Sequence, residues 1–194
     1  EYYEAINRFY GELDNGSVVN GNGAGREPNP VFFNSQYWWL TKKGNQNSGI
    51  PSLLEAVNVS QDRSVPEDGL FEENLKRLGL ISERNDRIYK VAYEGLSYYP
   101  QPDMMIYLRT SPKVCKERII KRGRLAERKI PIRYLESLNE LYEEWWARFE
   151  HPNKLMIETD GLNLADSIND QEEVHRKIAY NLADTPRVRI KRWH

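Results

Sequence analysis

The chain has 194 residues, of which 39% are hydrophobic and 29% are charged, and its formal net charge at pH 7 is −1. This length fits one ordinary domain and excludes two large ones, and the share of apolar residues excludes a disordered tail. The near balance of 28 basic and 29 acidic residues removes the overall attraction on which binding to nucleic acid or a membrane surface depends. We therefore expect a single domain over residues 1–194, with no nucleic-acid partner and no membrane partner.

Cysteine content and hydropathy bear on the compartment. The single cysteine, Cys115, cannot form an internal disulfide, which favours a reducing environment. No stretch reaches the ~18 apolar residues of a membrane span, and the first residues do not follow the pattern of a signal peptide. We predict a cytoplasmic protein, and a mitochondrial location stays open.

The first part of the chain is predicted to hold a long loop and one aromatic helix. Residues 1–13 suit a strand end that runs into a short helix. Residues 14–30 are dense in Gly, Asn and Pro, which tolerate turn conformations, so they predict a flexible insertion within the domain. Residues 32–42 place aromatic side chains on most sides of a helix, which favours a buried helix that lines a pocket; plain core packing is the alternative.

A short strand and two helices are predicted next. Residues 56–60 are β-prone and predict a buried strand that ends in the polar group Gln61–Ser64. A helix follows over residues 66–78, favoured by two acidic residues in a first turn where the helix dipole attracts negative charge. Ser82 predicts the cap of a second helix that ends near Tyr99. The expected apolar stripe of this second helix consists of Ile88, Ala92 and Leu96.

Strands and helices alternate through the rest of the chain. The apolar run at residues 104–108 predicts a central strand of a parallel sheet that is covered on both faces. A helix from Pro112 to a break at Gly123, a long helix over 130–150, a strand over 155–158 and a helix over 172–182 follow. This alternation predicts an α/β fold that binds its ligands at the carboxyl ends of the strands.

Three arginines gather where the helix after Pro112 ends. Arg118 and Arg122 are four residues apart on one helical face, and Arg124 follows a glycine at which the backbone can leave the helix. Guanidinium groups bind phosphate oxygens in a planar fork, so the three could converge on a polyphosphate and stabilise a phosphoryl group in transfer. The alternative is a solvated basic helix end that the helix dipole favours.

A second polar group lies after the predicted strand 56–60. Asp62 and Arg63 follow this strand, and Asp68 comes five residues after Arg63. At the carboxyl edge of a strand, an Asp and an Arg can hold a metal ion or orient a reacting hydroxyl. A surface ion pair is the alternative.

Four segments, in this order, resemble the deoxyribonucleoside kinase family. They are Gln61–Val65, Gln101–Arg109, Glu117–Arg124 and Ile130–Glu136. The resemblance covers roughly residues 62–146, with a fainter match back to Glu1. It implies an ATP-dependent kinase of P-loop architecture that phosphorylates the 5′-hydroxyl of a deoxyribonucleoside in nucleotide salvage, usually as a homodimer joined through helices.

The resemblance also implies a role for each matching residue. The catalytic residues that it implies are a general base, Glu1, an arginine near the 5′-hydroxyl, Arg63, and the lid arginines Arg118, Arg122 and Arg124. It associates Asp62 with magnesium. The residues that it implies for the nucleoside are Gln36, Lys43, Asp68, Phe71 and Glu127. Of these, Gln36 reads the base, Glu127 binds the sugar 3′-hydroxyl, and Lys43 stands where an arginine often pairs with the aspartate matched by Asp68.

The chain departs from this family at the phosphate loop. It contains no G-x-x-x-x-G-K-[ST] sequence, whose backbone amides and lysine cradle the phosphates of ATP. Pro66 also replaces the family's usual tyrosine, which leaves the register of the substrate pocket open. We expect a P-loop kinase-like parallel sheet with helices on both faces, whose N-terminal strand and phosphate loop are absent from this chain. The chain as given is then incomplete for activity with ATP and Mg²⁺.

Two other functions are consistent with the sequence. A nucleoside monophosphate kinase has a similar fold and lid, but its pocket needs a further cation for the acceptor phosphate, and no candidate is evident. A non-catalytic relative that binds or assembles would explain the missing phosphate loop. The retained lid arginines, together with Asp62 and Glu127, argue against it.

Overall fold

The computed structural model describes residues 30–96, 102–125 and 127–183. The expectations for residues 1–29, including Glu1 and nearly all of the insertion, lie outside the described residues. The described elements, in chain order, are α2 (Pro30–Leu54), α3 (Val65–Arg77), α4 (Glu83–Gly95), β1 (Met105–Arg109), α5 (Pro112–Arg122), α6 (Ile132–Arg148), β2 (Lys154–Glu158) and α7 (Ile168–Ala183).

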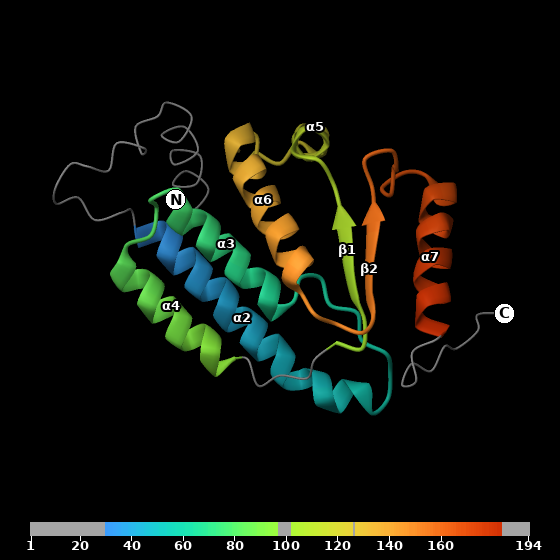
Figure 1. Ribbon diagram of the computed structural model, residues 1–194, viewed down its shortest axis with the longest axis horizontal. Helices are drawn as coiled ribbons and strands as arrows, with labels where there is room; N and C mark the ends of the chain where they lie inside the picture. Colours follow the sequence, from blue (N-terminus) through green and yellow to red (C-terminus); the bar gives the residue numbers. More distant parts are fainter. Residues whose placement is uncertain (1–29, 97–101, 126, 184–194) are drawn as a thin grey trace.

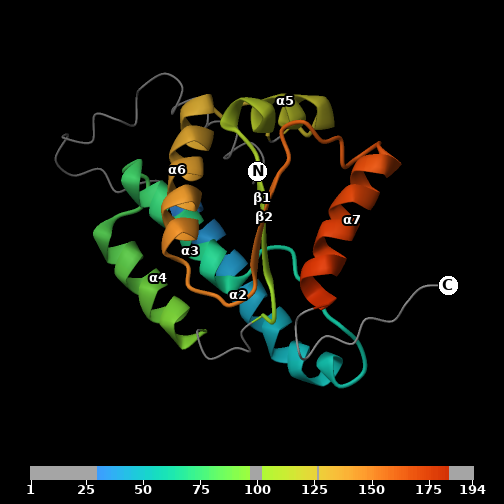
Figure 2. The ribbon, with the colours of Figure 1, turned by 45° about the vertical axis from the view of Figure 1, so that its right-hand side comes forward.

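The two strands form a parallel sheet that helices cover on both sides. β1 pairs with β2 in a register that runs from Met105 opposite Lys154 to Arg109 opposite Glu158. Met105, Tyr107 and Ile157 are buried, as the apolar run of the sequence predicts. Figure 2 views the sheet edge-on, with α6 on one side and α7 on the other. The predicted α/β class with a parallel sheet is therefore confirmed.

A layer of three helices, α2, α3 and α4, packs beside α6 (Figure 1). Its main apolar cluster joins side chains from α2, from α3 with the turn that follows it, and from α6. The buried members are Phe32, Leu75, Leu80, Ile81 and Tyr134. This cluster fixes α3 against α6, and so it fixes the residues that precede α3 relative to the sheet.

Local signals set the ends of α3. Ser64 and Glu67 form a capping box, in which the backbone N–H of Ser64 donates to the Glu67 carboxylate at 2.6 Å. Pro66 occupies the first turn, where a missing N–H costs nothing. The chain leaves the helix through Gly79, whose φ of 71° suits a glycine. The helix predicted at 66–78 is thus confirmed to within one residue at each end.

Gly123 ends α5 in the same way. It is the C-cap residue, with φ at 74° in the left-handed region that residues with a Cβ rarely adopt. At the other end, the Ser111 side chain accepts a hydrogen bond from the backbone N–H of Val114, so Ser111 is the N-cap. The predicted helix from Pro112 to a break at Gly123 is confirmed, and the break redirects the chain toward Arg124 and Glu127.

The strand expected over residues 56–60 is wrong. This segment is a turn followed by irregular chain, and the backbone N–H groups of Ala56 and Val57 donate back to the carbonyl of Leu53 at the end of α2. A strand needs a hydrogen-bonded neighbour. Within the described ranges, β1 and β2 pair only with each other, so the segment has no such neighbour.

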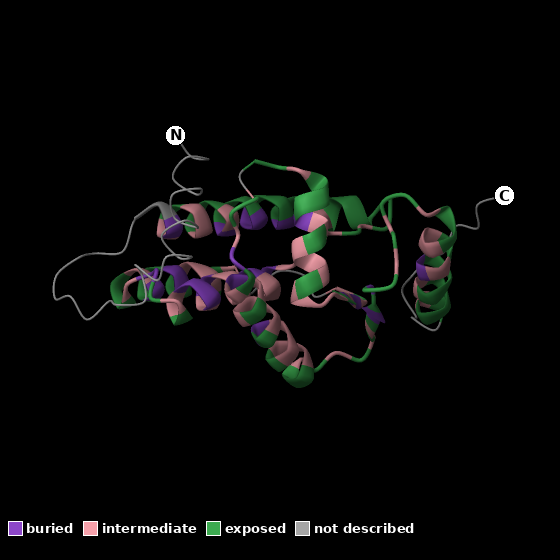
Figure 3. Cartoon of the chain, turned by 90° about the horizontal axis from the view of Figure 1, so that it is seen from above, coloured by how far each residue is buried: buried purple, intermediate pink, exposed green. Residues whose placement is uncertain are grey.

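Three helices differ in detail from the expectation. In α4 the buried residues are Asp86 and Tyr89, whereas Ile88, expected in the apolar stripe, is 42% exposed. The aromatic helix extends to Leu54, and Trp38 on it is 57% exposed, so its aromatic residues are not all buried. α7 begins at Ile168, earlier than expected, and most of its surface is exposed (Figure 3). Of the helices in the described ranges, none has the length and apolar character needed to cross a membrane.

Candidate functional site

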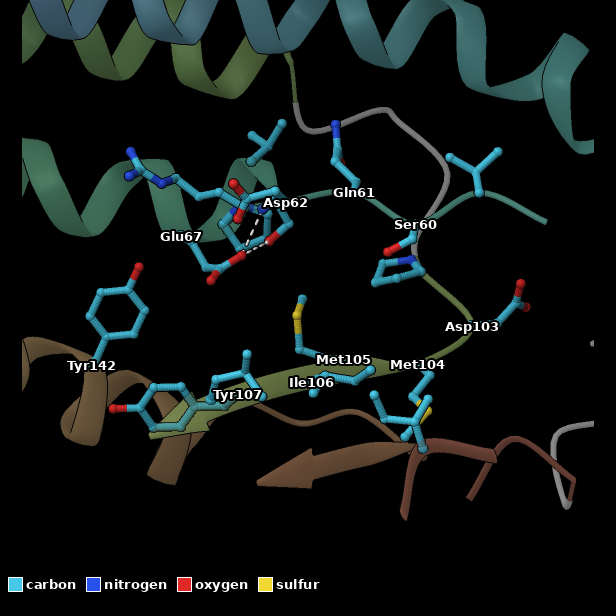
Figure 4. A pocket seen from close by; sticks show the side chains of 18 of the residues that line it. Ser60, Gln61, Asp62, Glu67, Asp103, Met104, Met105, Ile106, Tyr107 and Tyr142 are labelled. Atoms are coloured by element: carbon cyan, nitrogen blue, oxygen red, sulfur yellow. Dashed lines mark hydrogen bonds between the residues drawn. The ribbon is translucent and has the colours of Figure 1, made fainter. Parts of the chain in front are cut away.

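A cavity of about 940 Å³ lies between β1 and the segment that leads into α3. Residues 58–67 form one wall, and β1 with α6, α7 and the end of α2 contributes most of the rest. Figure 4 shows Gln61 and Asp62 on one side and Met105, Ile106 and Tyr107 of β1 on the other. Both predicted residues Asp62 and Arg63 line this cavity, whereas Gln36, Lys43, Asp68 and Phe71 do not.

Two side-chain contacts and an unusual backbone angle define the position of Arg63. Its φ is 60°, which is uncommon for a residue with a side chain and indicates a backbone that its surroundings hold in place. Its guanidinium carbon lies 3.9 Å from the centre of the Phe71 ring, and its Nη1 lies 3.8 Å from Oδ1 of Asp68. The structure thus brings together Arg63, Asp68 and Phe71, three residues that the sequence assigned to one site.

Aromatic stacking ties this arginine to the sheet. The Phe71 ring meets Tyr142 of α6 edge to face at 6.2 Å, and Tyr142 stacks on Tyr107 of β1 at 5.6 Å. The Tyr107 hydroxyl and the Arg109 guanidinium both donate to the carboxylate of Glu143 on α6, at 3.2 and 2.6 Å. The sequence did not reveal the role of Glu143, because its two partners on β1 lie 36 and 34 residues earlier in the chain.

Asp68 is a buried carboxylate without a hydrogen bond. It is 0% exposed, and among the described residues neither of its oxygens accepts a hydrogen bond. Burial raises the pKa of this carboxyl above its usual value, and the nearby Arg63 guanidinium partly opposes the shift. An unmet buried acceptor of this kind costs free energy until a donor reaches it.

The ion pair expected between Lys43 and Asp68 is wrong. Lys43 is buried on α2, and its Nζ donates to the backbone carbonyl of Asp62. The cation nearest to the Asp68 carboxylate is Arg63. Burial lowers the pKa of Lys43, and the Asp62 carboxylate nearby partly opposes this. Lys43 therefore holds the segment before α3 in place, which links α2 to Asp62 and Arg63.

A pair of buried carboxyl groups lies between α3 and α4, one helical turn beyond Asp68. Glu72 is 2% exposed, and the pKa of its carboxyl is raised to about 7 by burial and by Asp86 of α4. Asp86 stays ionised because Lys76 and Lys90 lie 2.7 and 3.0 Å from its oxygens, and they lower its pKa. The sequence did not reveal the contact between Glu72 and Asp86, because the two residues lie on different helices. It did place Glu72 on the same face of the predicted helix as Asp68, four residues earlier.

Arg118 does not join the other two lid arginines, so the predicted convergence of three guanidinium groups is wrong. Its Nη1 donates to the hydroxyls of Thr110 and Thr159, at 3.3 and 3.2 Å. Its Nη2 donates to the carbonyl of Leu162 at 2.9 Å, and also to that of Thr159. Arg118 thus binds the turn after β2 to the base of α5, a contact between segments that the spacing within α5 could not reveal.

Arg122 and Arg124 converge on Glu127. The Arg122 Nε donates to the Glu127 carboxylate at 3.0 Å, with a second contact from its Nη2, and the Arg124 Nη1 donates to the other oxygen at 3.3 Å. We call these three residues the lid clasp. Their side chains are 50%, 66% and 24% exposed in the order Arg122, Arg124 and Glu127. Two of the three predicted lid arginines therefore meet, and they meet on a residue that was predicted to bind the sugar.

The remaining predicted residues are placed as follows. Gln36 is partly buried on α2, two helical turns before Lys43. Asp62 is exposed at the wall of the cavity, and a single exposed carboxylate suits Mg²⁺, which uses one or two protein carboxylates and keeps several waters. In the part of the chain that the structure describes, no cluster of three or more His, Cys, Asp or Glu side chains could hold a metal ion.

Comparisons with known proteins give a consistent result. Residues 41–183 match the sequence model of a family described as deoxynucleoside kinase. Among curated proteins, the chain is 32% identical to a deoxyguanosine kinase of Dictyostelium discoideum over 73% of its length and 50% of the relative's. It is 28% identical to a deoxyadenosine kinase of the same organism, over 67% of its length and 58% of the relative's. The chain thus spans about half the length of these relatives.

The solved structures agree in fold. A deoxyadenosine kinase from M. mycoides with bound dCTP superposes with a TM-score of 0.64 at 25% sequence identity. The match covers 93% of this chain and 80% of that chain.

Proposed function

Because the chain belongs to the deoxynucleoside kinase family, we propose that its protein transfers the γ-phosphoryl group of ATP to the 5′-hydroxyl of a deoxyribonucleoside, in nucleotide salvage and as a homodimer. The match over residues 41–183 carries this proposal, since that range includes Asp62, Arg63 and all three residues of the lid clasp.

The acceptor nucleoside lies against the residues at the start of α3. Arg63 orients the 5′-hydroxyl, Glu1 accepts its proton, and Glu127 binds the 3′-hydroxyl of the sugar. Gln36 and Asp68 bind the base edge, where the unsatisfied oxygens of Asp68 accept from an exocyclic amine, which thymine lacks. The stacked ring of Phe71 keeps the Arg63 guanidinium in one plane, so it presents its donors in a fixed direction.

The lid arginines act on the donor side. As the phosphoryl group leaves ATP, negative charge gathers on its oxygens, and Arg122 and Arg124 stabilise that charge from the end of α5. When bound beside Asp62, Mg²⁺ supplies further neutralisation of the phosphate charge. Arg118 positions α5 against the turn after β2 and so sets the direction in which Arg122 leaves the helix.

The 194 residues contain no phosphate-loop sequence. Beyond the edge of β1 that does not pair with β2 lies the cavity of about 940 Å³, which leaves room for a further parallel strand next to β1 (Figure 4). In our proposal, the strand that precedes the phosphate loop occupies this space.

An activity assay on two chains tests the proposal. We expect the 194-residue chain to be inactive with ATP, Mg²⁺ and any of the four deoxynucleosides, since it cannot position the phosphates of ATP. A chain extended upstream of Glu1 by whatever its reading frame encodes should form the 5′-monophosphate. Comparable turnover by both chains would contradict the role given to the phosphate loop. A reading frame without a G-x-x-x-x-G-K-[ST] sequence would contradict the kinase proposal itself.

The base preference is expected to depend on Asp68. In the longer chain, Asp68→Asn keeps the shape of the side chain but removes the carboxylate that accepts from the base and faces Arg63. We expect kcat/KM to fall by about tenfold to 100-fold for deoxyadenosine, deoxyguanosine and deoxycytidine, and less for thymidine, because a lost hydrogen bond to a charged group costs about 1.5–3 kcal/mol. The names of the relatives, a deoxyguanosine kinase and a deoxyadenosine kinase, support a purine substrate.

A matched control is available on the same helix. Glu73→Gln removes the same charge from α3 at an exposed position that pairs with Arg77, so it should leave the ranking of the four nucleosides unchanged. If Asp68→Asn also leaves the ranking unchanged, or if the wild type prefers thymidine, Asp68 does not select the base.

A further inference from the structure

The lid clasp places one carboxylate in contact with two arginines. Glu127 reaches both because Gly123 turns the chain at the end of α5 and because its own backbone N–H donates to the carbonyl of Arg124 at 3.0 Å. Each oxygen of the Glu127 carboxylate accepts from a different arginine, Oε2 from Arg122 and Oε1 from Arg124. Both oxygens of the Glu127 carboxylate are thus engaged by lid arginines.

This arrangement competes with both ligands of the proposed reaction. The guanidinium N–H groups that Glu127 occupies are those that would bind phosphate oxygens, because carboxylate and phosphate use the same planar fork. In the proposed function, the Glu127 oxygens are also those that accept from the 3′-hydroxyl, and the inference rests on that role. Neither ligand can use its partners fully while the lid clasp is closed.

We infer that Glu127 is a positioning residue that couples the nucleoside site to the polyphosphate site. A nucleoside whose 3′-hydroxyl binds Glu127 weakens the hold on Arg122 and Arg124, and the two arginines then bind polyphosphate more tightly. Coupling of this kind is reciprocal, so polyphosphate must raise the affinity for the nucleoside by the same factor. The lid would then engage ATP chiefly when an acceptor is present.

The first test measures the binding of inorganic tripolyphosphate to a chain extended upstream of Glu1, by isothermal titration calorimetry without nucleoside. Glu127→Gln removes the competing charge, so we expect tripolyphosphate to bind about fivefold to tenfold more tightly than it binds the wild type. Glu144→Gln is the matched control, because Glu144 also contacts two arginines, Arg77 and Arg148, on an exposed surface of α6. An unchanged affinity in Glu127→Gln, or an equal gain in Glu144→Gln, overturns the inference.

The second test uses two nucleosides that differ only in the 3′-hydroxyl. Saturating deoxyadenosine should raise the affinity of the wild type for tripolyphosphate by about fivefold, whereas 2′,3′-dideoxyadenosine should not, and neither should do so in Glu127→Gln. Equal coupling by both nucleosides overturns the inference, as does coupling that survives in Glu127→Gln.

The two proposals fail separately. A protein that phosphorylates deoxynucleosides but shows no coupling retains the proposed function and loses the role given to Glu127. A protein that binds no deoxynucleoside loses the proposed function and the coupling with it.

Discussion

Replacing Arg122 with alanine in the longer chain is expected to lower kcat by about 100-fold or more, with little loss of nucleoside affinity. An arginine that stabilises charge on a phosphoryl group in transfer raises kcat by about 10³- to 10⁵-fold. Arg124 remains in the variant and supplies part of that stabilisation. The charge that Arg122 neutralises appears mainly as the phosphoryl group leaves ATP, so the loss falls on kcat rather than on the binding of the acceptor. Steady-state kinetics with saturating ATP, together with nucleoside titrations, measure both quantities.

The matched variant for this prediction is Arg148→Ala. Arg148 also pairs with a carboxylate, Glu144, on an exposed surface, but it lies at the end of α6 away from the lid clasp. We expect it to leave kcat unchanged. Normal turnover in Arg122→Ala with weakened nucleoside binding would place Arg122 on the acceptor side instead.

The stability of the 194-residue chain is expected to fall as the pH rises from about 4.5 to about 7, because of Glu72. Burial and Asp86 raise the pKa of this carboxyl from 4.5 to about 7 in the folded state. Between these two values the folded state holds a proton that the unfolded state has lost, so the free energy of unfolding decreases with rising pH. Since the two carboxyls are coupled, we expect a loss on the order of 2 kcal/mol, complete once the pH passes about 7.

Glu72→Gln isolates this effect. The amide can donate to Asp86 as the protonated carboxyl does, but it does not titrate. Most of the loss in the free energy of unfolding between pH 5 and pH 7.5 should therefore disappear in this variant. Urea unfolding at several pH values measures the slope. Glu73→Gln, at the exposed neighbouring position, should keep the wild-type slope, and a wild-type slope in Glu72→Gln would show that other groups control the pH dependence.

The sequence was enough to predict the elements whose ends are marked by capping residues, proline or glycine, or whose length is marked by an apolar run. Ser64 and Pro66 mark the start of α3 and Gly79 follows its end, and the apolar run marks β1, so the bounds of both elements were predicted closely. The segment 56–60 failed because a strand depends on a neighbour that no local pattern supplies. The prediction of which residues α4 buries was wrong for a related reason. Asp86 can be buried there because a lysine on another helix, Lys76, pairs with it, and hydropathy alone favours Ile88 instead.

The candidate site shows the same division. The sequence assigned Arg63, Asp68 and Phe71 to one site, and the structure brings them together because all three lie within the first turns of α3 or just before it. The spacing of the arginines placed Arg118 with Arg122, since both lie on one face of α5. Two of the partners of Arg118, Thr159 and Leu162, follow β2 about forty residues later, and no pattern within α5 indicates them.

The contact of Arg118 with the turn after β2 has a consequence for how this region can evolve. Arg118 donates to the main-chain carbonyls of Thr159 and Leu162, and every amino acid carries such a carbonyl. Substitutions at Leu162 therefore leave its part of the contact intact, provided that the backbone keeps its path. Arg118 itself has no equivalent, because lysine lacks the planar fork that reaches several acceptors at once. In natural variants of this protein, position 162 should accept many residues while position 118 stays arginine.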